Sequence, residues 1–157
     1  MTTDALGSLQ GSISSVSGGI PGALLEEAAY EAHRLAATTL PADVKQAFVG
    51  MRDRESEELP KHALEAIVDN FHAAEEDQRP VCADVGVPRI YAVIGNETAI
   101  AGGFVALERA VRQATARITH DLALRSNRCH PITRRNPGNN VGVFAPNIEY
   151  RVEPDGD

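Results

Sequence analysis

The stretch GGFVALERAVRQATARITHDL, residues 102–122, is a long amphipathic pattern between two segments with strand character. Its apolar residues recur every three or four positions, which indicates a helix that begins after the pair Gly102-Gly103. These apolar residues are Phe104, Leu107, Val111, Ala114, Ile118 and Leu122. Charged residues occupy the other face, so we expect the helix to bury one side and to expose the other.

A predicted strand lies on each side of this helix in the sequence. Residues 90–94 are apolar and rich in β-formers, and residues 147–152 form a second such segment near the end of the chain. The sequence Pro-Gly-Asn-Asn at 137–140 is a strong turn signal between the helix and the second strand. The pattern therefore predicts a strand–helix–strand unit.

Three further helices are predicted before the first strand. Apolar stripes at helical spacing follow Pro21 and Pro41, and a third follows Pro60. Residues 1–20 are rich in Ser and Gly and predict a flexible tail. The whole pattern is that of an α+β fold with an N-terminal helical layer, in a single domain over residues 21–157.

The amino-acid composition excludes several classes of function. The chain has 157 residues, 15 Lys and Arg against 22 Asp and Glu, and a formal net charge of −7. The acidic balance argues against nucleic acid as a partner. There is no run of about 18 apolar residues to span a membrane and no visible secretory signal, so we expect a cytoplasmic protein. Two cysteines cannot form a disulfide scaffold or by themselves hold a zinc or iron–sulfur site.

The charge is unevenly distributed along the chain. Residues 1–87 hold 15 acidic and six basic residues, whereas residues 88–157 hold seven acidic and nine basic residues. Four arginines and one histidine lie close together in the second part, with no acidic residue between them. They are Arg125, Arg128, Arg134, Arg135 and His130. Arginine suits bidentate binding of carboxylate or phosphate, so this segment favours a small anionic ligand. The alternative is a solvated basic loop.

The cysteines and two of the other histidines are weak signals by themselves. Cys82 lies between Pro80 and Gly86, where a thiol could project into a cleft, but a lone cysteine is most often a small buried hydrophobic residue. Cys129 and His130 are adjacent, so their side chains point in different directions and do not predict a metal or nucleophile site. His62 and His72 are predicted to be surface residues.

Three segments in order nevertheless resemble the class I, iron–sulfur fumarate hydratases and the alpha subunit of L(+)-tartrate dehydratase. Residues 79–86, RPVCADVG, are similar to the family pattern Pro-x-Cys-Gln-Asp-Thr-Gly. Leu124-Arg125 follow the long helix, and residues 130–140, HPITRRNPGNN, resemble Pro-Leu-x-Arg-x-Asn-Thr-Gly-x-Asn. In addition to these three segments, residues 148–157 are similar to the family's strand that ends in Gly-Asp. The resemblance covers residues 22–157.

The resemblance implies a hydro-lyase that adds or removes water at a C4 dicarboxylate, such as fumarate/malate or tartrate/oxaloacetate. It implies a [4Fe–4S] cluster held by three cysteines, of which Cys82 is the first, with one open iron acting as a Lewis acid. Asp84 would be the catalytic hydrogen-bonding or proton-transfer group, and Arg125 would bind a substrate carboxylate. The motif at 130–140 adds His130, Arg134 and Asn136 as substrate-binding residues that shape the site.

The sequence also departs from the family pattern. Ala83 replaces the family's Gln and Val85 replaces its Thr, which removes polar groups near the substrate. The other two cluster cysteines lie downstream of the segment present here, and Cys129 is not at a ligand position. We therefore expect this chain alone to bind no cluster and to have no hydratase activity.

Two hypotheses follow from the resemblance. In the first, the chain is part of a larger hydro-lyase, completed by a C-terminal region or a companion beta chain, with a homodimer as the default assembly. In the second, it is a stand-alone, cluster-free domain of the same fold that binds small carboxylates or a partner protein. A helical scaffold without a ligand is the third alternative.

Overall fold

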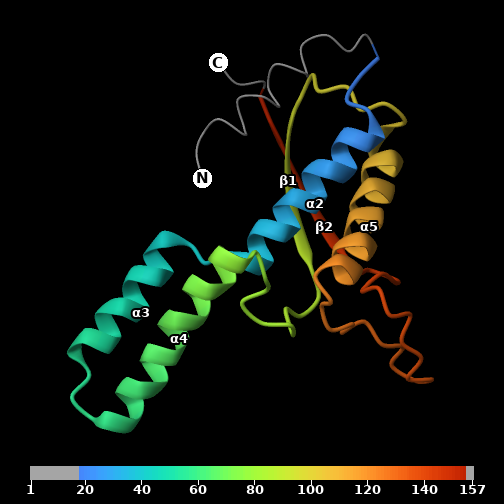
Figure 1. The fold of residues 1–157 in the computed structure, drawn as a ribbon. Helices are drawn as coiled ribbons and strands as arrows, with labels where there is room; N and C mark the ends of the chain where they lie inside the picture. Colours follow the sequence, from blue (N-terminus) through green and yellow to red (C-terminus); the bar gives the residue numbers. More distant parts are fainter. Residues whose placement is uncertain (1–17, 155–157) are drawn as a thin grey trace.

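The computed structural model describes residues 18–154, so residues 1–17 of the predicted tail lie outside the described residues. The chain forms four helices and two strands within the described range (Figure 1). They are α2 (Gly22–Thr38), α3 (Ala42–Arg54), α4 (Glu58–Asp77), β1 (Arg89–Gly95), α5 (Gly103–Asp121) and β2 (Asn147–Glu153). This order confirms the predicted α+β class, and each strand extends the predicted one by one or two residues.

The strands β1 and β2 are parallel neighbours, and α5 is the crossover between them. Arg89 pairs with Asn147 and Gly95 with Glu153, so the register is continuous over the full length of both strands. Parallel strands need a long crossover, usually a helix, and the predicted strand–helix–strand unit supplies one. This unit fixes where the segments before β1 and after α5 meet.

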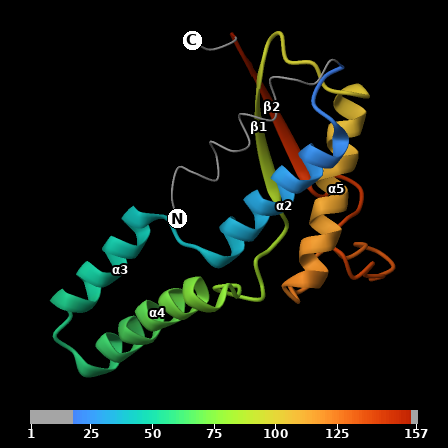
Figure 2. The same ribbon diagram turned by 45° about the horizontal axis from the view of Figure 1, so that its top comes forward.

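Helix α5 forms the centre of the core. Leu107, Val111, Ala114 and Ile118 are buried, as the periodicity predicts. Helix α2 packs along α5 (Figure 2). The first residue of the predicted stripe is an exception. Phe104 is 53% exposed, because it lies in the first turn of α5, at the margin of the core. Its ring meets the ring of Tyr150 edge-on, with 5.4 Å between the ring centroids.

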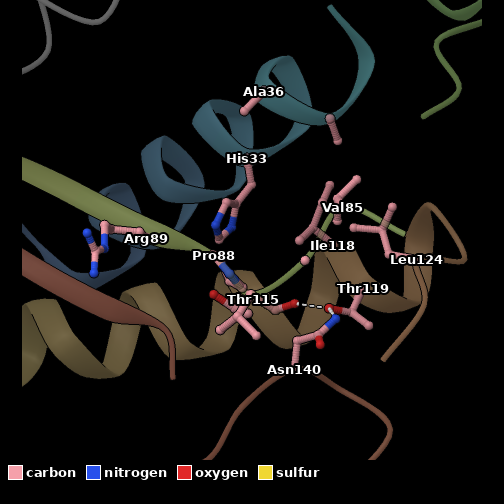
Figure 3. A pocket seen from close by; sticks show the side chains of 13 residues that line it. His33, Ala36, Val85, Pro88, Arg89, Thr115, Ile118, Thr119, Leu124 and Asn140 are labelled. Atoms are coloured by element: carbon pink, nitrogen blue, oxygen red, sulfur yellow. Dashed lines mark hydrogen bonds between the residues drawn. The ribbon is translucent and has the colours of Figure 1, made fainter. Parts of the chain in front are cut away.

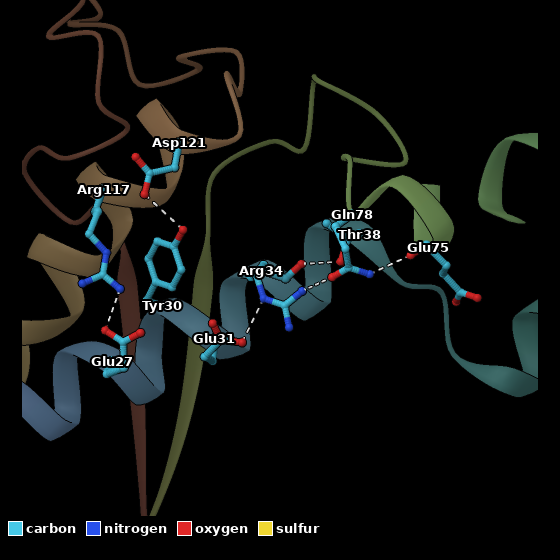
Figure 4. Close-up of polar contacts among 9 residues, drawn as sticks. All are labelled: Glu27, Tyr30, Glu31, Arg34, Thr38, Glu75, Gln78, Arg117 and Asp121. Atoms are coloured by element: carbon cyan, nitrogen blue, oxygen red, sulfur yellow. Dashed lines mark hydrogen bonds and ion pairs between the residues drawn. The ribbon is translucent and has the colours of Figure 1, made fainter. Parts of the chain in front are cut away.

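Polar contacts also join α2 to α5. The guanidinium of Arg117 lies 3.7 Å from the ring centroid of Tyr30 and donates to Glu27 at 2.7 Å (Figure 4). The Tyr30 hydroxyl donates to Asp121 at 3.0 Å. His120 and Tyr30 together hold the pKa of the Asp121 carboxyl below its usual value. Arg117, which sequence periodicity puts on the charged face, therefore contacts the neighbouring helix.

Helices α3 and α4 form a hairpin that projects away from the α2–α5 layer (Figures 1 and 2). The side chains of Val68, Phe71 and Ala74 on α4 are buried. The Val81 amide donates to the carbonyl of Ala37 at 2.9 Å, which ties the chain after α4 to the end of α2. His62 and His72 are exposed on α4, as predicted.

The first described residues lie against the loop before α5. Ile20 donates to the carbonyl of Ala99 at 2.8 Å and accepts from the amide of Ala101 at 3.1 Å. A Cβ on Gly19 would lie 2.8 Å from the carbonyl oxygen of Ala99, so this approach requires glycine. Among residues 18–154, none of the helices is both long and apolar enough to cross a membrane.

Candidate functional site

The structure brings two of the predicted site residues into direct contact. Arg125, just after α5, donates to the carboxylate of Asp84 at 2.9 Å, although the two residues are 41 positions apart. The backbone amide of Arg125 also donates to the carbonyl of Ala83, at 2.8 Å. The side chains of Arg125 and Asp84 are 68% and 49% exposed, so the ion pair is open to solvent and to a ligand.

The loop that carries Asp84 is fixed by backbone geometry as well as by this pair. Gly86 has φ of +78°, a left-handed conformation that glycine adopts without strain. The Gly86 carbonyl accepts a hydrogen bond from the Asn127 side chain at 3.2 Å. The loop between α4 and β1 is therefore attached to the segment that follows α5 by three hydrogen bonds, at Ala83, Asp84 and Gly86.

The buried side chain of Asn140 holds the segment after α5, residues 125–128, in place. Its Oδ1 accepts from the amides of Asn127 at 2.7 Å and Arg128 at 3.3 Å. Its Nδ2 donates to the carbonyl of Arg125 at 3.1 Å and to the hydroxyl of Thr119 at 3.3 Å. In the sequence, Asn140 stands out only as the last residue of a motif. Its hydrogen bonds show that it positions the backbone of residues 125–128.

Asn136 holds the turn that precedes Asn140. Its Oδ1 accepts from the amide of Gly138 at 2.9 Å and from the hydroxyl of Ser126 at 2.6 Å, and its Nδ2 donates to the carbonyl of Ser126 at 2.8 Å. All three hydrogen-bond partners of the Asn136 amide are other groups of this chain. The residue that the resemblance assigns to substrate thus has a clear role in joining the 136–138 turn to the segment after α5.

His130 and Arg134 lie on an exposed loop beyond this turn. His130 Nδ1 accepts from the amides of Ile132 at 3.2 Å and Thr133 at 3.1 Å, which leaves Nε2 to carry the proton of the neutral ring. Arg134 has φ of +60°, and its carbonyl accepts from the Cys129 thiol at 3.0 Å.

An open groove of about 540 Å³ runs along this part of the chain. Its lining residues are Arg128, His130, Thr133, Arg135, Asn136, Pro137, Val141, Gly142 and Val143. Neither Arg125 nor Asp84 belongs to that lining. The structure therefore brings Asp84 and Arg125 together as one pair and places His130 and Asn136 along a separate groove.

The two cysteines differ in their surroundings. Cys82 is exposed, two positions before Asp84, so the interpretation of a lone cysteine as a buried hydrophobic residue is wrong for this position. Cys129 is half-buried and bonded to the loop backbone. Within residues 18–154, no three His, Cys, Asp or Glu side chains are grouped so that they could hold a metal ion. The described residues thus contain one exposed thiol, that of Cys82, and no complete set of metal ligands.

A cavity of about 230 Å³ lies behind the Asp84 loop, between α2 and α5 (Figure 3). Val85, Gly86 and Pro88 of that loop form part of its wall, and His33 of α2 points into it. Both ring nitrogens of His33 are buried without a hydrogen-bond partner among the described residues. No motif in the sequence points to His33, although the residue lies one helical turn before the buried Ala37 and so falls on the packed side of α2.

His33 predicts a pH dependence of stability. Burial lowers its pKa from the ordinary value of 6.5, so the unfolded chain takes up a proton at a higher pH than the folded chain. The stability that depends on the neutral His33 ring is fully present above pH 6.5 and is lost as the pH falls through the folded-state pKa of His33. We expect the urea midpoint of wild-type chain to fall between pH 7.5 and 5.5 by more than that of His33→Leu. Equal slopes for the two chains would contradict this role, and His62→Leu is the matched control at an exposed histidine.

The chain is similar to known proteins over most of its length. The model of the family described as fumarate hydratase (Fumerase) matches residues 26–157. A Methanocaldococcus jannaschii protein provisionally named L(+)-tartrate dehydratase subunit alpha is 37% identical over 128 residues, which are 80% of this chain and 45% of that protein. A Geobacillus stearothermophilus protein provisionally named fumarate hydratase class I is 28% identical over 129 residues, 80% of this chain and 24% of its own length.

The L(+)-tartrate dehydratase subunit alpha of Escherichia coli strain UTI89 is 28% identical over 120 residues, which are 76% of this chain and 39% of the subunit. The chain thus spans less than half of the length of each of these relatives. The match to the family nevertheless covers both segments that form the Asp84–Arg125 pair and the motif that contains Asn140. On this evidence, the chain belongs to the fumarate hydratase (Fumerase) family.

Proposed function

We propose that this chain is the N-terminal, alpha part of an iron–sulfur hydro-lyase that adds or removes water at a C4 dicarboxylate. The observation that carries the proposal is the exposed Asp84–Arg125 pair, two residues from an accessible thiol in the same loop. A dicarboxylate needs a cationic group that can bind a carboxylate in two-point fashion, and the arginine fork provides it. Fumarate/malate and tartrate/oxaloacetate are the substrate pairs that the family resemblance suggests.

The ion pair explains how Arg125 would exchange its partner. Solvent-exposed ion pairs contribute only about 0–1 kcal/mol to stability. A substrate carboxylate can therefore replace Asp84 on the guanidinium at little cost, because the arginine keeps an anionic partner throughout. Asp84, released from Arg125, would lie beside the bound substrate, where its carboxylate can accept or return a proton at the carbon next to the carboxylate.

The cluster belongs to the assembled enzyme in this proposal. When bound, a [4Fe–4S] cluster with an open iron supplies Lewis-acid chemistry for the departing hydroxyl. Cys82 would give one thiolate to it, and the other ligands would come from a downstream region or a companion chain. Two of the relatives are named as alpha subunits, which supports such a companion. Because thiolate ligands stay reduced in the cytoplasm, we place the assembly there, with a homodimer as its default form.

The proposal is tested on the enzyme as it is assembled in its own cells. The tagged chain is purified anaerobically with everything that is attached to it, and its activity is measured with malate, fumarate and tartrate. We expect Cys82→Ser to reduce the activity by more than about 100-fold, since changes that only orient a metal ligand already cost 10–100-fold. Cys129→Ser, the control thiol, should stay within about twofold of wild type.

Three outcomes of this experiment count against the proposal. The first is an active preparation in which Cys82→Ser has no effect, and the second is a preparation with no activity on any of the three acids. The third is an equal loss in both cysteine variants, because it would show a general sensitivity to thiol loss rather than a ligand at Cys82.

A further inference from the structure

The cavity beside His33 has the size of a small-molecule site. It is a partly open cavity of about 230 Å³ between α2, α5 and residues 85–89. An engineered apolar cavity of about 150 Å³ in another protein admits benzene, so this one has room for a ring with a substituent. Figure 3 shows His33 pointing into this space from α2, opposite Thr115 and Asn140.

The walls are mainly apolar. Ala36, Val85, Ile118 and Leu124 supply methyl groups and aliphatic chains. The polar wall residues already have partners. The Thr115 hydroxyl donates to the carbonyl of Val111 at 2.8 Å, and the Thr119 hydroxyl donates to the carbonyl of Thr115 at 2.7 Å.

The exception is His33, whose two ring nitrogens have no partner within the described structure. Burying a polar group without a hydrogen bond is costly, and a ligand that restores the bond recovers that cost. Burial also lowers the pKa of His33, which favours the neutral ring. A neutral imidazole offers one donor and one acceptor, so the complementary ligand is uncharged and carries a hydroxyl or similar group.

We propose that this cavity is a second binding site, separate from the Asp84–Arg125 pair, for a small uncharged molecule with an apolar ring or chain and one hydrogen-bonding group held by His33. Val85 directly follows Asp84, and Leu124 directly precedes Arg125. A bound molecule therefore contacts both segments of the ion pair from behind. The site does not depend on the proposed hydro-lyase activity, because its lining residues and its hydrogen-bonding group are independent of the cluster and the dicarboxylate.

The test compares phenol with benzene as probes of the full chain. An apolar void prefers benzene, because phenol must leave its hydroxyl without a partner. A site with a free imidazole binds phenol at least as tightly as benzene. Dissociation constants are measured by NMR titration, following the methyl signals of Val85, Ile118 and Leu124. We expect His33→Leu to shift the preference toward benzene by about five- to tenfold, which is the loss of one net hydrogen bond. His62→Leu, at an exposed position of α4, should leave the preference between phenol and benzene unchanged.

A second measurement needs no variant. Phenol should shift the ring nitrogen signals of His33 in wild-type chain, whereas benzene should shift the methyl signals without a matching change at the imidazole. The proposal is overturned if neither probe binds up to its solubility limit, if the methyl shifts lie outside the cavity, or if the preference between phenol and benzene is the same in wild type and His33→Leu.

Discussion

Asn140→Ala is expected to lower the free energy of unfolding by about 3 kcal/mol or more. The substitution leaves two backbone amides, a carbonyl and a threonine hydroxyl without the partner that each has in the native chain. The side chain is 2% exposed, so water cannot readily replace the amide. Unsatisfied buried polar groups cost about 1–3 kcal/mol each, although relaxation of the loop recovers part of the sum.

The backbone conformation adds to the cost of this substitution. Asn140 has φ of +57°, where asparagine is tolerated and alanine pays about 1–2 kcal/mol. Asn140→Gly separates the two effects, because glycine accepts this conformation but has no side-chain amide. We expect Asn140→Gly to regain about 1 kcal/mol relative to alanine and to remain well below wild type.

Urea unfolding at pH 7.5 measures these differences. Asn139→Ala is the matched control, since the neighbouring amide loses one local bond to the amide of Val141 and should cost less than about 1 kcal/mol. If Asn140→Ala had the same midpoint as Asn139→Ala, the hydrogen bonds of Asn140 would not hold the segment that carries Arg125.

The strand–helix–strand unit could be predicted because its pattern is local. The apolar period of residues 102–122 and the β-rich segments on either side each carry their own signal, and a helix between two strands is typical of a parallel pair. The projection of the α3–α4 hairpin could not be predicted. An apolar stripe shows that a helix packs against something, but it does not identify the partner or the direction of the helix in space.

The candidate site, too, could be predicted from the sequence only in part. The motifs identified Asp84 and Arg125 by type, but their contact depends on the place where two loops meet in the fold. His33 was missed because a histidine within an alanine-rich helix has no sequence signal for a cavity, which forms from residues of four separate segments. Asn140 was underestimated for a related reason. A motif residue after a Pro-Gly turn looks like part of the turn, whereas its amide bonds to residues 12–21 positions earlier.

Arg125→Ala is expected to weaken the binding of fumarate or succinate to the full chain by about 10- to 100-fold, because it removes a charge-assisted, two-point contact with a carboxylate. Isothermal calorimetry in metal-free buffer measures this directly and does not depend on the cluster. Arg125→Lys keeps the charge but lacks the fork, so an intermediate loss is expected. Arg109→Ala removes the same charge from an exposed position on α5 and should change the affinity by less than about twofold.

Substitution of Asp84, the ion-pair partner of Arg125, separates substrate binding from proton transfer. In the free chain, Asp84 occupies the guanidinium that the substrate needs, so Asp84→Asn should bind the dicarboxylate several-fold more tightly. The same variant should lose hydratase activity in the assembled enzyme, because an amide cannot accept the proton. Opposite effects on binding and activity at Asp84, together with a loss of both at Arg125, would assign the arginine to substrate and the aspartate to proton transfer. Unchanged binding in Arg125→Ala would instead show that the pair only joins two loops, since a carboxylate held elsewhere would not depend on this guanidinium.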